Sequence, residues 1–511
     1  MLKIFSAPFL VLFLSVPLFA QEDTGWVRTY SGPYYGDWVT DLAVDNSGNV
    51  YVTGHSMRDD NTTEFATIKY YHNGDTAWVR RYSDSTNVWA VPTDLEIDDS
   101  GNVFITGISV AGFIPPSQES VTIKYHSNGD TSWIRKYHRR DYESSSSMSI
   151  AVDYFHNVYV TGASWGDETY DYATIKYYPN GETAWVRIYS GPANYNVPYK
   201  LRLDSAGNIY ITGISYSGGS YNDYDYATIK YYPNGDTAWV RRYNGPESNM
   251  DRPFDLAVDD SGNAYVTGYS YSSQTKYDYL TIKYRANGDT AWTRRHPGTS
   301  DNRDSAMAVT VDSKGNVYVM GSNYGNGTGR DYVLIKYSPD GKFIWERRYN
   351  GTGNSNEYAY DLALDHSDNA YVTGYSKNSA GTYDLVTVKY SSNGGAYCTR
   401  RFNTAVFQDY LPHFTAIAVD TSHNVYVGGT KGYPGDYLTI KYNPIITVGD
   451  ANSDGSVGIS DVVYLVNYLF KTGPAPEPIK KGDINGDGDV TISDIVYLIN
   501  YLFKGGPSPV C

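Results

Sequence analysis

Cysteine is nearly absent from this sequence. Its 511 residues include only Cys398 and Cys511, too few for a framework of disulfides, so the folded state must be stabilised by packing or by bound metal. Cys398 stands where other copies of a repeated segment have a strand Val, and we expect it to be a small core residue. A bond between the two cysteines is possible, but nothing in the sequence indicates it.

Positive charge is also scarce. The chain has 41 Lys and Arg against 56 Asp and Glu, a net charge of −15, and no block of basic residues. An acidic surface repels phosphate backbones and anionic lipids. We therefore expect no nucleic-acid partner.

Long hydrophobic runs are missing after the first 20 residues. Lys3, the apolar run from Pro8 to Phe19 and the small Ala20 fit a secretory signal peptide, residues 1–20, with an uncleaved anchor as the alternative. No later run is long enough to span a bilayer. The sequence predicts a secreted protein, extracellular or at the cell surface, with no membrane span after signal cleavage.

Local signatures of catalysis are expected to be absent, including the nucleophile elbow of Gly-x-Ser-x-Gly type. The nine histidines are scattered, and no His-Glu-x-x-His motif occurs. Because paired carboxylates leave no local motif, glycoside hydrolysis in a central channel stays open as an alternative to a protein that is not an enzyme. A carboxylate pair in the channel would favour the enzyme, and its absence the binding protein.

The sequence does contain a unit of about 53 residues that recurs eight times between residues 23 and 442. Its marks are Asn-Val-Tyr-Val-Thr-Gly, Thr-Ile-Lys-Tyr and Ala-Trp-Val-Arg-Arg-Tyr. In the first copy, turn residues separate four expected strands, at 41–45, 49–54, 66–71 and 76–82. Each unit is therefore expected to form one antiparallel sheet of four strands.

The second strand of each unit has consecutive apolar residues, which predicts protein on both of its faces. The stacked blades of a β-propeller provide such cover. The last copy ends at Tyr442 without a Trp strand, whereas an unpaired strand of this type, residues 23–30, stands near the start. We predict an all-β, eight-bladed β-propeller over residues 21–444, with the N-terminal strand closing the last blade.

The repeats resemble a bacterial family of extracellular β-propeller repeats whose hallmark is Gly-Asn-x-Tyr-Val-Thr-Gly. This resemblance implies the propeller fold and a structural or binding role. It implies little about activity, since fold does not determine function.

Two repeated features are candidate sites. One Asp ends the first strand of every unit. These residues could form a ring of carboxylates that binds a cation or substrate, but turn chemistry favours the alternative that each Asp caps its own turn. Tyr-Asp-Tyr stands before the third strand at 170–172, 224–226 and 277–279. These loops are the expected face for a polysaccharide or protein ligand, with packing between blades as the alternative. The eight repeated aspartates are Asp45, Asp98, Asp153, Asp204, Asp259, Asp312, Asp365 and Asp420.

After Tyr442 two loops have oxygen-bearing residues at positions 1, 3, 5, 7 and 12 and Gly at position 6, the spacing that wraps Ca²⁺. Position 7 would supply its backbone carbonyl. We predict two calcium ions, one held by each loop. The predicted ligands are Asp450, Asn452, Asp454, Ser456 and Asp461 in the first loop and Asp483, Asn485, Asp487, Asp489 and Asp494 in the second.

A helix is expected after each loop, at 460–471 and 493–504. One helix per loop, and Asp rather than Glu at position 12, resemble a type I dockerin, the EF-hand-like, calcium-dependent module that docks proteins onto cohesin domains. Residues 445–511 would form this small all-α domain. The resemblance implies cohesin contacts through either of two near-identical halves, with a calcium-stabilised domain lacking a cohesin partner as the alternative. The implied contact residues are Ile459, Ser460, Lys471, Ile492, Ser493 and Lys504.

These features predict a secreted, non-enzymatic binding or scaffold protein, with a propeller recognition face joined to a calcium-dependent docking module. The alternative is a component of an extracellular polysaccharide-degrading complex, acting by glycoside hydrolysis or carbohydrate binding.

Overall fold

The computed structural model describes residues 24–504 apart from 35, 59–61, 85–86, 113–116, 140–143, 220–221, 248, 299–303, 326, 352–353, 395–396, 408–413, 445–447 and 455–456. The predicted signal peptide, Ser456 and Cys511 lie outside these residues. Cys398 is buried, as expected of a core residue, and it is disulfide-bonded, a possibility that the sequence left open.

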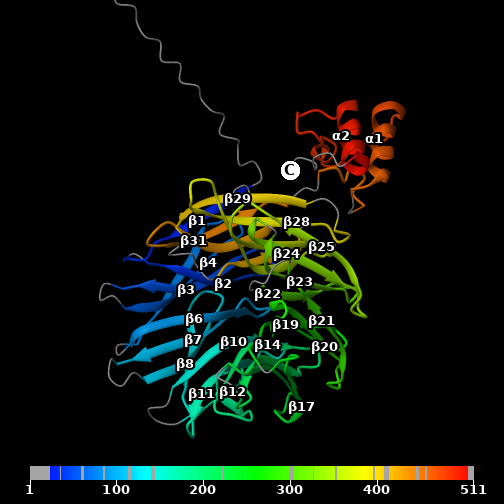
Figure 1. Cartoon of the computed structure of the whole chain (residues 1–511). Helices are drawn as coiled ribbons and strands as arrows, with labels where there is room; N and C mark the ends of the chain where they lie inside the picture. The colour runs from blue at the N-terminus through cyan, green and yellow to red at the C-terminus, as the bar shows by residue number, and fades with distance from the viewer. Residues whose placement is uncertain are drawn as a thin grey trace, which may run out of the picture.

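Eight four-stranded antiparallel sheets are arranged around a centre as blades of a β-propeller (Figure 1). The inner strands are β2 (Trp38–Val44), β6 (Asn87–Ile97), β10 (Ser145–Val152), β14 (Asn196–Leu203), β18 (Asp251–Val258), β22 (Ser305–Val311), β26 (Glu357–Leu364) and β30 (Ala416–Val419). The second strands are β3 (Val50–Met57), β7 (Val103–Ala111), β11 (Val158–Gly166), β15 (Ile209–Tyr216), β19 (Ala264–Ser272), β23 (Val317–Gly325), β27 (Ala370–Lys377) and β31 (Val425–Lys431).

The outer half of each blade consists of the Thr-Ile-Lys-Tyr strand and the Trp strand. The third strands are β4 (Thr63–Tyr70), β8 (Ser117–Tyr125), β12 (Thr169–Tyr177), β16 (Tyr224–Tyr231), β20 (Lys276–Tyr284), β24 (Gly329–Tyr337), β28 (Tyr383–Tyr390) and β32 (Asp436–Tyr442). The outer strands are β5 (Thr76–Tyr82), β9 (Thr131–Tyr137), β13 (Thr183–Tyr189), β17 (Thr237–Tyr243), β21 (Thr290–His296), β25 (Phe343–Tyr349), β29 (Tyr397–Val406) and β1 (Thr24–Tyr30).

The ring closes through its two chain ends, as predicted. Strand β1 pairs antiparallel with β32, so that Val27 lies opposite Ile440 and Tyr30 opposite Tyr437. The resulting sheet has the order β1-β32-β31-β30. The first strand of the repeat region thereby becomes the outer strand of the last blade and covers an edge that would otherwise be open.

The second strands form the packed interior of the propeller. Val50, Tyr51 and Val52 are all fully buried, and the same three positions are buried in the other blades, which confirms protein on both faces. The Gly that ends the repeated phrase is required by a close approach: at seven of these glycines an added Cβ would lie 1.6 to 2.3 Å from a carbonyl oxygen of the inner strand. The inner strand bulges at this point in the same seven blades.

The C-terminal domain contains the helices α1 (Ile459–Lys471) and α2 (Ile492–Lys504), with the short 3₁₀ helix η2 (Ile479–Lys481) between them. The two helices lie side by side, apart from the blades (Figure 1). Their small core includes Leu465, Leu498 and Ile484. No helix in the described part of the chain has the length and apolar content needed to cross a membrane.

Candidate calcium and docking site

The first predicted calcium loop brings three carboxylates together. One oxygen each from Asp450, Asp454 and Asp461 lies within 4.8 Å of the others. Asp461 stands in the first turn of α1, where its two oxygens accept hydrogen bonds from the backbone N–H groups of Asn452 (3.1 Å) and Gly458 (2.8 Å). Burial raises the pKa of Asp461 to about 6, and the charges of Asp450 and Asp454 add to the shift. Such a cluster favours a bound cation.

The second loop repeats the anchoring of the first. Asp494 accepts from the backbone N–H groups of Asn485 (3.1 Å) and Thr491 (2.8 Å), at the positions equivalent to Asn452 and Gly458. Asp483, however, accepts from the backbone N–H groups of Asp487 and Gly488, both at 3.0 Å. The described side chains of this loop do not converge as closely as those of the first. The loop has the predicted donor set in a more open arrangement.

Each helix exposes an apolar face beside its loop. On α1 the face consists of Ile459, Val463 and Phe470, which are 58%, 55% and 60% exposed. On α2 the equivalent side chains are Ile492, Val496 and Phe503, at 58%, 52% and 65%. Spacings of four and eleven residues place each triad on one side of its helix. We call these two triads the α1 face and the α2 face.

The predicted contact residues lie around these faces. Ile459 and Ile492 belong to them, and Ser460, Ser493, Lys471 and Lys504 are exposed next to them. The prediction missed Val463, Phe470, Val496 and Phe503. These residues are apolar but do not share the helical spacing of the buried Val462 and Leu465, and this difference could have indicated an exposed face. A helix sequence alone, however, does not tell which apolar residues a partner helix covers.

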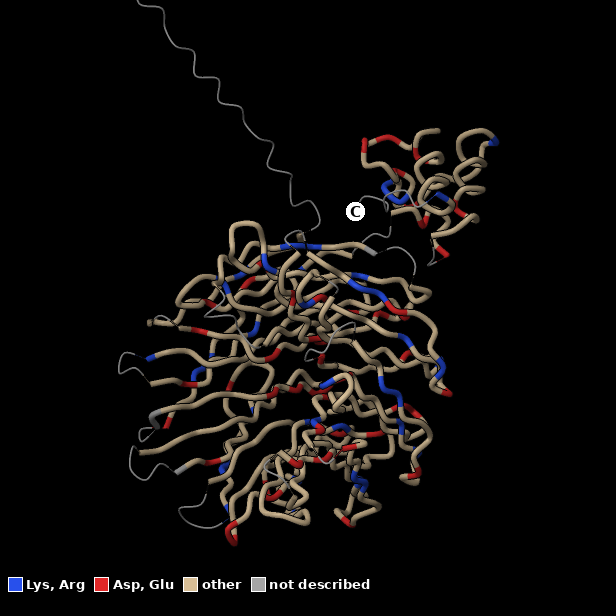
Figure 2. The backbone as a smooth tube through the Cα atoms, viewed as in Figure 1, with Lys and Arg blue, Asp and Glu red and all other residues tan. Residues whose placement is uncertain are grey.

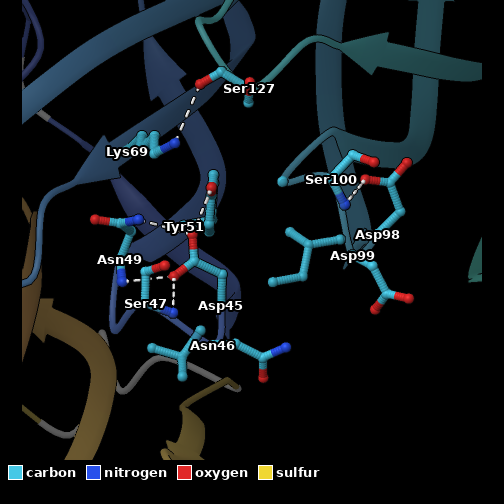
Figure 3. Close-up of a pocket in the computed structure, with 13 residues that line it drawn as sticks. Asp45, Asn46, Ser47, Asn49, Tyr51, Lys69, Asp98, Asp99, Ser100 and Ser127 are labelled. Atoms are coloured by element: carbon cyan, nitrogen blue, oxygen red, sulfur yellow. Dashed lines mark hydrogen bonds between the residues drawn. The ribbon is translucent and has the colours of Figure 1, made fainter.

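The repeated aspartates are turn caps, as predicted. Figure 3 shows Asp45 accepting from the backbone N–H groups of Ser47 and Asn49, at 2.9 and 2.8 Å, and from the side chains of Asn49 and Tyr51. The same turn bonds occur at the other seven aspartates. Beside Asp45, a pocket of about 410 Å³ lies between blades 1 and 2. Two of its carboxylates, Asp45 and Asp98, are engaged by their own turns.

The Tyr-Asp-Tyr segments lie within third strands rather than in the loops expected from the sequence. Asp225 and Asp278 form ion pairs with Arg242 (2.7 Å) and Arg295 (2.8 Å) of the adjacent outer strands. The second Tyr is buried in each copy, as Tyr226 is. Two of the three residues therefore hold the blade together, and only the first Tyr is partly accessible.

Carboxylates also meet in the central channel. Asp41 and Asp94, on the inner strands of blades 1 and 2, both line this channel. Burial raises the pKa of Asp41 well above its usual range, and the charge of Asp94 adds to this shift. Burial opposes ionisation of Asp94, but Lys200 and Arg202 outweigh it and lower its pKa. Carboxylates, the feature that would favour an enzyme, are therefore present in the channel, and Asp41 and Asp94 are each held by a backbone N–H group of the following blade.

One segment matches a catalytic motif in sequence but forms part of a regular β-strand. Residues 162–166 read Gly-x-Ser-x-Gly, which in a nucleophile elbow forms a sharp turn from a strand to a helix. Here all five residues lie in β11 and pair in register with β12. Ser164 is buried and 3.1 Å from the hydroxyl of Ser145. The segment has neither the turn nor the exposed serine of an elbow.

Comparison with solved structures supports the fold. Sqt1 from Chaetomium thermophilum is 9% identical, with a TM-score of 0.52 over 82% of this chain and 98% of that one. Lower similarity is found to virginiamycin B lyase from Staphylococcus aureus, with 10% identity and a TM-score of 0.38 over 81% of this chain and 98% of that one. Polysaccharide lyase Uly1 is 10% identical, with a TM-score of 0.43 over 71% and 91%. At these identities the similarity concerns the fold alone.

Comparison with protein families identifies both parts of the chain. The family of the beta-propeller repeat matches residues 25–57 and 238–273, and the family of the dockerin type I domain matches residues 448–503. No curated protein matches the sequence. Dockerin domains generally bind calcium, and the Asp cluster at 450–461 is placed accordingly. The chain thus consists of an eight-bladed propeller of beta-propeller repeats followed by a C-terminal type I dockerin domain.

Proposed function

We propose that this protein is a secreted, non-enzymatic scaffold that docks onto a cohesin-like partner through its dockerin domain and presents the propeller to a polysaccharide or protein ligand. The docking role is supported chiefly by the matched α1 and α2 faces. Exposed apolar patches of this kind, on an otherwise small and well-packed domain, are typical of interaction surfaces. The two faces are equivalent in sequence and in exposure, so each offers one docking surface.

Calcium dependence follows from the position of the metal loops. Asp461 and Asp494 stand in the first turns of the helices that carry the two faces. A cation bound by Asp450, Asp454 and Asp461 would fix the loop to the start of α1 and neutralise clustered negative charge. We propose one ion per loop, two in all, held by the residues predicted from the sequence.

Surface plasmon resonance of the mature chain over an immobilised cohesin domain tests this function. Binding in millimolar Ca²⁺ that disappears in EGTA and returns when Ca²⁺ is restored is the expected result. Binding that is equal in Ca²⁺ and EGTA would contradict calcium-dependent docking. Reducing-sugar assays on polysaccharides retained by the protein test the non-enzymatic assignment, which product release would contradict.

A further inference from the structure

A cavity of about 370 Å³ lies where the inner strands of the eight blades converge. Each blade contributes one residue from an equivalent position of its innermost segment. In seven of the blades this residue is the one at the bulge of the inner strand. Unlike the repeated residues that hold the blades together, this residue differs between copies. Blades 3 to 7 contribute Met148, Tyr199, Phe254, Met307 and Tyr360, whereas blades 8, 1 and 2 contribute Thr415, Thr40 and Thr93. The cavity wall is therefore apolar and aromatic on one side and hydroxylic on the other.

The next residue of the inner strand makes the wall acidic. It is Asp41, Asp94, Asp255 and Asp361 in blades 1, 2, 5 and 7. Each of these carboxylates accepts a backbone N–H of the following blade at 2.8 to 2.9 Å, which holds it in place. Red segments of Asp and Glu are visible in the central region of the propeller in Figure 2.

Two cations in the wall offset only part of this charge. Lys200 lies 3.4 Å from Asp94, and Arg202 lies 3.9 Å from Asp255. Burial lowers the pKa of the neighbouring His55 to about 4, so this side chain adds no positive charge at neutral pH. Among the residues that line the cavity, four carboxylates thus face two cations, although burial disfavours ionisation of one of them, Asp41. Burial raises the pKa of Asp361 to about 6, as expected of a carboxylate that lacks a close cationic partner.

A second observation indicates a ligand. Thr415 lines the same cavity, is 6% exposed and has a hydroxyl without a hydrogen-bond partner among the residues that the structure describes. A buried hydroxyl normally has a partner in a folded protein, and a polar group of a bound molecule would provide one here. Thr415 lies in blade 8, between Asp361 of blade 7 and Asp41 of blade 1.

The chemistry of the wall selects among ligand classes. In the described part of the chain, only Asp450, Asp454 and Asp461 bring three acidic groups close enough to hold one metal ion, so the channel carboxylates do not form a metal cage. Excess negative charge disfavours an anion. Aromatic faces attract cations, and Arg252 already lies over the rings of Tyr199 and Phe254, at 4.8 and 5.1 Å.

We propose that the central cavity binds a small organic cation, a primary or quaternary ammonium compound, with its apolar body against the aromatic side of the wall and its charge toward Asp361. This site goes beyond the docking function and does not depend on it. Its size is that of a pocket for a small molecule.

Calorimetry of the mature full chain in calcium buffer, with choline and its neutral isostere 3,3-dimethyl-1-butanol, tests the proposal. We expect choline to bind at least about tenfold more tightly than the isostere, because only choline gains the cation–π and carboxylate attraction. Equal affinities, or no choline binding up to about 10 mM, would overturn the proposal.

Variants locate the site. Asp361→Asn keeps the shape and an acceptor for the N–H of Ile417, and should weaken choline binding at least about tenfold. Asp340→Asn makes the same charge change at an exposed turn and should leave affinity unchanged. Tyr360→Leu provides a second test if Asp361→Asn melts at a lower temperature than the parent, and it should also weaken binding. Parental affinity in a folded Asp361→Asn or Tyr360→Leu variant would overturn the assignment.

Discussion

The indole nitrogen of Trp239, on the outer strand of blade 4, donates a 3.1 Å hydrogen bond to the carbonyl oxygen of Ala286 in a turn of blade 5. The guanidinium of Arg241 lies over the same indole ring and donates to the carbonyl of Gly288 in that turn. The same indole and guanidinium bonds occur at five other Trp strands, which explains why Trp and Arg are repeated together. These are the strands of Trp26, Trp78, Trp133, Trp185 and Trp292. The Trp strands join neighbouring blades, so their aromatic rings are not ligand platforms.

Replacing Trp239 by Ala should therefore destabilise the propeller. Its side chain is 7% exposed, and loss of the buried ring is expected to cost about 3 to 5 kcal/mol in the free energy of unfolding. Trp89→Ala is the comparison, because Trp89 is 55% exposed and its replacement should cost less. Urea unfolding followed by tryptophan fluorescence measures both. Equal losses, or a parental midpoint for Trp239→Ala, would contradict this account.

A buried glutamate predicts a dependence of stability on pH. Glu357 is fully buried, and burial raises its pKa from 4.5 to about 8. A raised pKa in the folded state means that the neutral form is favoured there. The contribution of neutral Glu357 to the free energy of unfolding is therefore fully present below about pH 4.5 and is lost as the pH rises toward 8. Glu357→Gln removes this titration. The advantage of the variant over the parent in the free energy of unfolding should grow by about 3 kcal/mol between pH 5.5 and 8.5.

Urea unfolding of parent and variant at both pH values measures this difference. Because other acidic groups with raised pKa values titrate in both proteins, the comparison isolates Glu357. A difference between variant and parent that stays constant across this range, or that falls with rising pH, would show that Glu357 is ionised in the folded protein.

The architecture could be predicted because it depends on local chemistry repeated eight times. Asp45 caps its turn through atoms two and four residues away, and Asn73-Gly74 forms a hairpin by itself, so both are visible in a single copy. Closure followed from counting, since the strand with Trp26 was the one strand without a blade. The limits of the inner strand were less predictable: the first begins at Trp38 rather than at residue 41, because the bulge between Val39 and Asp41 interrupts the alternation.

The sites depended on contacts between blades or helices that no single segment contains. The Asp of Tyr-Asp-Tyr resembles a ligand residue until Arg295 is seen to reach Asp278 from the next strand. The channel carboxylates lie in strands of different blades, and their proximity follows from ring closure rather than from spacing. Val463 reads as a core residue in the helix sequence, but a domain of two helices is too small to cover every apolar side chain.

Calcium binding should show two sites of which each can be removed separately. Asp461→Asn and Asp494→Asn each take one carboxylate from position 12 of one loop, where Ca²⁺ requires anionic oxygen. Calorimetry on metal-stripped protein should give two ions for the parent and one for each variant. Glu477→Gln, at an exposed position of the linker between the loops, is the control and should keep two. A parental stoichiometry in both position-12 variants would contradict the proposed ligands.

The two docking faces predict a particular pattern of single and double variants. Val463→Asp puts a charge in the centre of the α1 face, and Val496→Asp does the same on the α2 face; an interface that buries this charge would lose affinity because the carboxylate has no partner there. If either face can dock, each single variant should keep cohesin affinity within about twofold, the statistical loss of one of two equal sites. The double variant should lose at least about a hundredfold. Both positions are exposed, so thermal melts in Ca²⁺ should match the parent. A single variant that abolishes binding would show that only its own face docks, and a double variant that binds normally would show that neither does.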